Sequence, residues 1–245
     1  MDITLDLNRW IHIVFGFVGL AAFWVPVFAR KGGPLHRSAG KVFRWSAFVV
    51  LAAAGFAVIG NGADALARGI TPADNPESWG FLLFLGYLAL VTGVILSHGF
   101  GVLKHKRDPT AMDSPYRRVS AWAAITASVV LIAYALYFRP DNMIILLALS
   151  PLGIGNGRQI LQVVSGKRNE PGLWKLEHLN AMLGCGIAFH TAFAVFGINR
   201  LTDYSLPGMW QVVPWILPAA IGIPAISIWM RRERARFARA NTQPA

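Results

Sequence analysis

The strongest constraint on this chain is a set of seven long apolar runs, each close to the ~20 residues that an α-helix needs to cross a lipid bilayer. These runs do not alternate apolar and polar residues as membrane barrel strands do. Helices also satisfy their own backbone hydrogen bonds in lipid. We therefore expect an all-α, polytopic transmembrane helix bundle. The seven helices are expected at about residues 9–29, 42–61, 79–103, 119–138, 142–164, 176–198 and 211–230.

The composition agrees with a membrane environment. Of the 245 residues, 55% are hydrophobic and 14% are charged, whereas a soluble domain carries roughly 25% charged residues. The connections are too short to fold alone, so we expect one seven-helix domain over residues 1–245. The net charge of +11 requires no nucleic-acid partner, because basic residues beside membrane helices contact membrane lipid.

The distribution of Lys and Arg predicts the orientation. Most of the 23 basic residues lie after the first, third, fifth and seventh runs. The opposite side of the bundle holds Arg9, Arg68, Arg139 and Arg200. By the positive-inside rule, the N-terminus is then outside and the C-terminus is in the cytoplasm. The short loops favour a bacterial inner membrane, and the oligomeric state is left open.

Four histidines are expected within the membrane. The predicted topology places His12 and His190 in the outer half of the bilayer, and His98 and His178 in the inner half. Glycines accompany His12, His98 and His190 along their helices. Small residues let helices approach closely or leave room for a flat ligand, so these helix faces are expected to point into the bundle.

A polar site is expected at the cytoplasmic end. The segment SPLGIGNGRQ, residues 150–159, predicts a broken helix, which is tolerated only inside protein or beside water. Arg158 is expected to pair with Glu177, because a lone charge at that depth is unfavourable. Beside His98 and His178, the expected members of this inner polar site are His36, Arg37, Arg158, Glu177 and Asn180.

Three short segments carry a resemblance. They are an HR-x-x-G segment after the first helix (His36, Arg37, Gly40), a histidine near the start of that helix, and an H-x-x-x-M-L…T-A-F segment that begins at His178. Together they resemble a group of uncharacterised bacterial multi-pass membrane proteins. Many members carry a second His-Arg motif after the third helix, where this chain reads LKHKRDP. The resemblance implies a membrane location and no particular activity.

Haem binding is one functional hypothesis. A b-type haem needs two imidazoles from facing helices and a slot lined by small residues. His98 with His178 would hold one iron, and His12 with His190 a second, which would permit transmembrane electron transfer. The outer pair matches in depth only if the first helix begins early, near Leu5.

Three alternatives stay open. Intramembrane histidine and glutamate beside a broken helix also suit a proton-coupled transporter of a small solute, or a site for a small-molecule or quinone-like ligand. A membrane-embedded metal enzyme would want closely spaced ligands such as H-x-x-x-H, which the sequence lacks. Finally, buried polar residues can simply specify helix packing in a scaffold protein.

Overall fold

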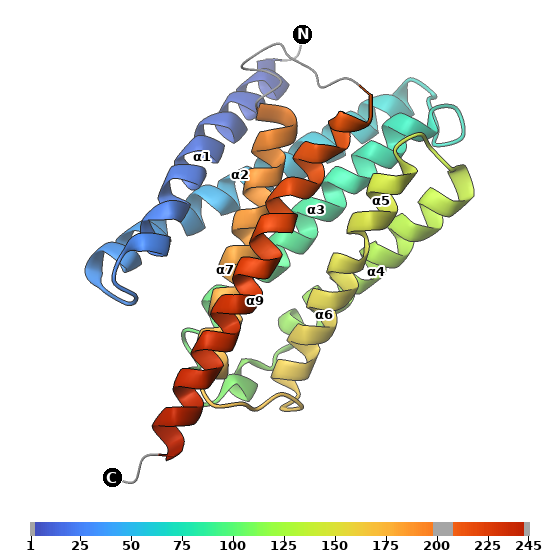
Figure 1. The fold of residues 1–245 in the computed structure, drawn as a ribbon. Helices are drawn as coiled ribbons and strands as arrows, with labels where there is room; N and C mark the ends of the chain where they lie inside the picture. Colours follow the sequence, from blue (N-terminus) through green and yellow to red (C-terminus); the bar gives the residue numbers. More distant parts are fainter. Residues whose placement is uncertain (1–2, 198–207, 243–245) are drawn as a thin grey trace. The chain divides into compact units, whose positions relative to one another are not determined.

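A computed structural model of the chain describes residues 3–197 and 208–242 (Figure 1). All regular elements among these residues are helices. Seven helical spans in the described part are long and apolar enough to cross a membrane, by length and composition. This confirms the all-helical multi-pass architecture, while the orientation of the termini stays a prediction. The main helices are α1 (Ile3–Phe28), α2 (Pro34–Ala67), α3 (Pro76–Gly101), α4 (Pro115–Phe138), α5 (Met143–Leu149), α6 (Pro151–Val164), α7 (Leu173–Ala192) and α9 (Val213–Thr242).

Several helices begin earlier than the apolar runs. α7 begins at Leu173, so Glu177 lies one turn inside the helix rather than at its edge. α1 begins at Ile3, before the start near Leu5 that a depth match between His12 and His190 requires. Whether these two histidines pair stays a prediction. The π-helical turn Phe193–Gly197 continues α7. The predicted end of this span at residue 198, and Arg200 of the charge pattern, lie outside the described residues.

The start of α2 corrects one prediction. His36 and Arg37 were expected in a loop, but they lie in the first turn of α2. Pro34 occupies the first helical position, where its missing N–H removes no helix hydrogen bond. His36 also bonds through Nδ1 to the Pro26 carbonyl of α1 at 3.2 Å. Proline at the first position therefore extends the helix into a polar segment that hydropathy assigns to a connection.

The predicted break in the fifth span is observed between α5 and α6. Pro151 cannot donate a backbone hydrogen bond, and Oγ of Ser150 donates instead to the Leu147 carbonyl, four residues before the proline, at 3.0 Å. Tyr87 of α3 also contacts the break with its buried hydroxyl. That hydroxyl accepts from the Gly153 amide at 2.8 Å and points to the carbonyls of Leu149 and Ser150, at 3.0 and 2.8 Å. Polar backbone exposed by the break is thus satisfied inside the protein, as lipid requires.

The chain forms two compact units. The first contains Met1–Gly93 and Ala123–Gly155, and the second contains Val94–Trp122 and Asn156–Ala245. In the first unit α1 packs against α2, and in the second α7 packs along α9 (Figure 1). The expectation of a single domain stays a prediction.

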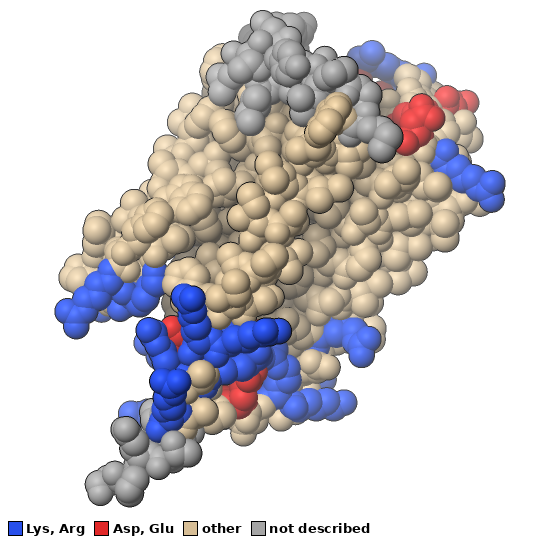
Figure 2. Space-filling model, in the orientation of Figure 1, with Lys and Arg blue, Asp and Glu red and all other residues tan. Residues whose placement is uncertain are grey.

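Large apolar side chains cover much of the helix surface. Ile59, Ile144 and Phe28 are 74%, 74% and 81% exposed. Side chains of this kind are unfavourable in water over so wide an area, and lipid is their natural surrounding. Several Lys and Arg side chains, in contrast, gather around the C-terminal part of α9 in the second unit, and others lie apart from this group (Figure 2).

Candidate functional site

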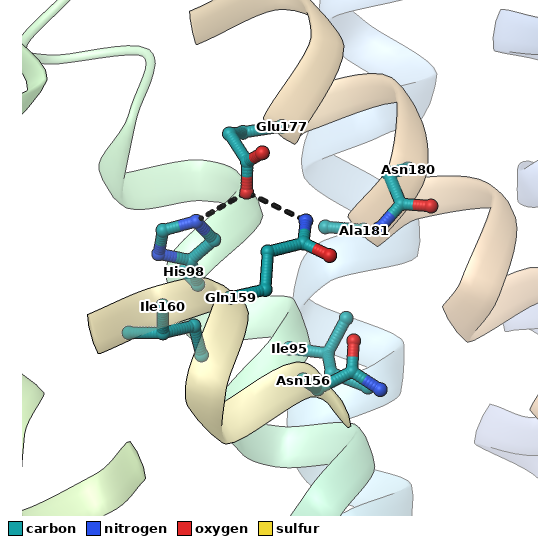
Figure 3. Close-up of a pocket in the computed structure, with 8 residues that line it drawn as sticks. All are labelled: Ile95, His98, Asn156, Gln159, Ile160, Glu177, Asn180 and Ala181. Carbon is teal, nitrogen blue, oxygen red and sulfur yellow. Dashed lines mark hydrogen bonds and ion pairs between the residues drawn. The ribbon is translucent and has the colours of Figure 1, made fainter. Parts of the chain in front are cut away.

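The candidate site is a buried polar cluster in the second unit, centred on Glu177 of α7. Its Oε2 atom accepts a hydrogen bond from Nε2 of His98 on α3 at 3.0 Å and from the amide of Gln159 on α6 at 2.8 Å (Figure 3). The Glu177 side chain is 0% exposed and that of His98 is 4% exposed. Three helices therefore meet at one carboxylate that has no contact with solvent.

The cationic partner of Glu177 is Arg168, not Arg158. Nη1 of Arg168 donates to Oε1 of Glu177 at 2.7 Å. Arg158 is exposed, and no ion pair joins it to Glu177 among the described residues. The reason is helix phase: each residue turns the helix by about 100°, so on α6 Gln159 faces Glu177 and its neighbour Arg158 points away.

A tight turn brings Arg168 to this position. After α6, Gly166 adopts a left-handed conformation with φ of 70°, which glycine tolerates without strain. The amide of Gly166 then bonds to the Val163 carbonyl and that of Arg168 to the Gln162 carbonyl, both at 3.1 Å. The chain is thereby reversed over the end of α6. Arg168 consequently reaches the buried carboxylate from the connection that precedes α7.

Gly99 allows α3 and α7 to approach closely. A Cβ atom at this position would lie 2.5 Å from Cβ of Ala181 and 2.7 Å from Cε of Met182. Nδ1 of His178 donates to the Gly99 carbonyl at 2.8 Å. The predicted close approach beside His98 is therefore observed. The space next to this glycine is filled by side chains of α7 rather than left for a flat ligand.

A small cavity adjoins the cluster. It has room for about one water molecule. Three predicted site residues, His98, Glu177 and Asn180, border it, together with residues that the sequence did not indicate. The lining consists of Ile95, His98, Asn156, Gln159, Ile160, Glu177, Asn180 and Ala181 (Figure 3).

One buried polar atom of the cluster has no protein partner. Nδ1 of His98 makes no hydrogen bond within the part of the chain that the structure describes. An ionised carboxylate only accepts hydrogen bonds. When Glu177 is ionised, Nε2 of His98 is therefore the donor. In the neutral imidazole Nδ1 then carries the lone pair, a basic site held within the protein.

The cluster continues to the surface through alternating charges. Arg168 also donates from Nη2 to Oε1 of Glu170 at 2.6 Å. Arg234 of α9 donates to the same carboxylate from Nε at 2.8 Å and from Nη2 at 3.3 Å. Glu170 lies outside the membrane spans, and the hydrogen bond from Arg234 lowers the pKa of its carboxyl. The Arg168 side chain is 23% exposed and that of Arg234 is 47% exposed, so exposure rises away from Glu177.

The remaining predicted residues lie elsewhere. His12, His36 and Arg37 belong to the first unit. Whether they contribute to a site with second-unit residues stays a prediction. His190 lies in the last turn of α7, where Nδ1 donates to the Gly186 carbonyl at 2.7 Å. The described residues contain no group of three or more His, Cys, Asp or Glu side chains that could hold a metal ion.

Sequence reasoning missed Arg168 and Gln159. Arg168 lies in a basic connection, and the sequence therefore indicates for it only a contribution to the orientation of the chain in the membrane. Its position nine residues before Glu177 is the one available clue, because a short connection can return a side chain to the start of the next helix. Gln159 carries no charge, so nothing in the pattern distinguishes it from other polar residues.

Comparisons with protein-family models, curated protein sequences and solved structures gave no match for this chain. The resemblance to multi-pass bacterial proteins therefore stays a prediction, and the function must be inferred from the geometry of the cluster.

Proposed function

We propose that the protein is a proton-coupled membrane carrier of a small solute, and that the His98–Glu177 pair binds the proton. The supporting observation is the 3.0 Å hydrogen bond between the two buried side chains. Ionisable groups within a membrane span are unfavourable and mark proton or substrate routes. An imidazole that is hydrogen-bonded to a carboxylate can take up and release a proton on its ring, so this pair suits reversible proton binding.

The surroundings of the pair support a proton better than a large ligand. The adjoining cavity is of water size, and a water molecule can relay a proton. Arg168 is partly exposed and touches Glu177 directly. The buried pair is therefore one side chain away from solvent.

Proton flux in proteoliposomes tests the proposal. Vesicles carrying an internal pH dye would receive an imposed pH gradient, with and without mixtures of amino acids, sugars and organic acids outside. Wild-type protein is expected to exceed protein-free vesicles in at least one condition. Glu177→Gln and His98→Gln should abolish the excess, while His105→Gln in the loop after α3 should retain it. Equal flux for wild type and Glu177→Gln in every condition would refute the proposal.

Haem binding is the second candidate, and one feature favours it. Nδ1 of His178 and of His190 each donate to a backbone carbonyl, an arrangement common among metal-binding imidazoles. Against it, Nε2 of His98 is bound to Glu177. An optical spectrum decides between the two candidates. A Soret band that disappears in both His98→Ala and His178→Ala would establish an inner haem and displace the carrier proposal.

We further propose a bacterial inner-membrane location with the N-terminus outside. The alternating distribution of Lys and Arg supports this orientation. A reporter that is active only in the cytoplasm should give signal when fused after Ala245. The same reporter inserted between α2 and α3, at residues 68–75, should give none. The opposite result would reverse the assigned topology.

A further inference from the structure

The charges around Glu177 form a continuous row from the bundle interior to its surface. The order is His98, Glu177, Arg168, Glu170 and Arg234, with a hydrogen bond at each step. His98 and Arg168 both bond to the buried carboxylate of Glu177. Glu170 bonds to Arg168, and Arg234 bonds to Glu170.

Charge balance sets how many protons the buried pair can hold. With Arg168 on Glu177, one positive and one negative charge meet, and a neutral His98 leaves the cluster uncharged. A further proton on His98 would leave a net positive charge in the interior, which is strongly unfavourable. If Arg168 left, however, Glu177 would be an unpaired buried anion, and protonated His98 would restore neutrality.

We infer that Arg168 and a proton compete for the His98–Glu177 pair. In the arrangement seen here, Arg168 occupies Glu177 and His98 keeps a single proton on Nε2. When the guanidinium moves to solvent, a hydronium ion of the aqueous phase donates a proton to the lone pair on Nδ1 of His98 and leaves water. The imidazolium then neutralises Glu177, and return of Arg168 expels the proton. This inference rests on the proposed proton-carrying role and names the residue that regulates it.

The other groups near the pair are compatible with this exchange. Gln159, Asn156 and Asn180 are uncharged and border the cavity. His178 bonds through Nδ1 to the Gly99 carbonyl. On the α3 side, Arg117 of α4 donates to Ser97 at 3.0 Å. Among the described residues it forms no ion pair with Glu177. Arg168 is thus the cation that contacts the carboxylate.

Glu170 and Arg234 form a strap that holds Arg168 in place. Glu170 accepts from both arginines, so the position of Arg168 depends on a residue of α9. A separate contact joins α7 to α9: Glu233 of α9 bonds to Lys175 of α7 and to Arg236 of its own helix. Loss of Arg234 should therefore loosen Arg168, whereas loss of Arg236 should not.

Nitrogen NMR of ¹⁵N-histidine-labelled full-length protein in lipid tests the competition. The ring nitrogens report whether His98 is imidazole or imidazolium, and His98→Asn assigns its signals. At neutral pH the wild type is expected to show neutral His98. Arg168→Gln should raise the imidazolium-to-imidazole ratio by about tenfold or more, since a nearby charge changes proton affinity by at least this factor. Arg168→Lys, which keeps the charge, should lie nearer the wild type.

Two surface variants keep the test independent of folding problems at the buried site. Arg234→Gln should raise the imidazolium fraction in the same direction by a smaller factor. Arg236→Gln, at a side chain that is 74% exposed and paired with Glu233, should leave it unchanged. Neutral His98 in both Arg168→Gln and Arg234→Gln would overturn the inference.

The outcome also separates this inference from the proposed function. His98 could become protonated in Arg168→Gln while the wild-type protein shows no more proton flux than Glu177→Gln. That result would support the competition between Arg168 and the proton and would refute the carrier function. Flux that depends on Glu177, with His98 unchanged in Arg168→Gln, would keep the carrier and reject the competition.

Discussion

Nε2 of His98 donates to Oε2 of Glu177 across 3.0 Å, although the two residues are 79 positions apart in the sequence. The bond joins the end of α3 to the second turn of α7 and lies out of contact with solvent. A carboxylate so placed must be balanced locally, because unpaired charge in a low-dielectric interior is strongly unfavourable.

Removing Glu177 alone should destabilise the protein more than removing it together with Arg168. Glu177→Gln leaves the Arg168 guanidinium without its buried anion, at a loss of about 3 kcal/mol of unfolding free energy. Arg168 keeps its bond to Glu170, but adding Arg168→Gln removes the charge that has lost its buried partner and should recover part of that loss. Denaturant unfolding in mild detergent measures both variants. If the double variant is less stable than Glu177→Gln alone, the charges of Glu177 and Arg168 do not stabilise each other as a pair.

Gly99→Ala should disrupt the contact between α3 and α7. The new methyl group would lie 2.5 Å from Cβ of Ala181, and overpacking of this kind costs about 1–3 kcal/mol. The matched control is Gly184→Ala on α7, where an added Cβ meets no atom within 4 Å. That change should be neutral or stabilising, because alanine favours helix. Thermal unfolding of the two variants should therefore shift in different directions, and equal shifts would contradict the close approach.

Tyr87→Phe should weaken the junction of α5 and α6. The change removes the acceptor for the Gly153 amide and the donor for the Ser150 carbonyl. Unsatisfied buried groups of this kind cost about 1–3 kcal/mol. Tyr137→Phe is the control, since that side chain is 81% exposed. Hydrogen exchange at Gly153 gives a local measurement, and unchanged protection would mean that another group satisfies this amide.

Acid should weaken the ion pairs that Glu170 forms with Arg168 and Arg234. Hydrogen bonds from Arg234 and then Arg168 lower the pKa of this carboxyl, and burial partly opposes them. A lowered folded-state pKa contributes stability above the unfolded value of about 4.3. This contribution is lost as the pH falls through the folded-state pKa. Arg234→Gln should therefore reduce stability at neutral pH and flatten its decline below about pH 4.3. Arg236→Gln should keep the wild-type acid profile, and a profile unchanged in Arg234→Gln would exclude this linkage.

The membrane spans and the break near Pro151 could be predicted from the sequence. Both depend on local chemistry: hydropathy over about 20 residues decides whether a helix suits a bilayer, and proline lacks a backbone donor wherever it occurs. Glu177, His98 and Asn180 could be selected for the same reason, since polar residues in apolar runs are visible without coordinates.

The pairing of these residues depended on the tertiary structure. Arg158 and Arg168 were equally available to Glu177 in sequence, yet the phase of α6 turns Arg158 outward and the Gly166 turn brings Arg168 back. Side chains of consecutive helix residues point in directions about 100° apart. Hydropathy does not show which of two neighbouring polar residues, such as Arg158 and Gln159, faces the interior. The sequence therefore determined that Glu177 lies in an apolar span, and packing decided which arginine meets it.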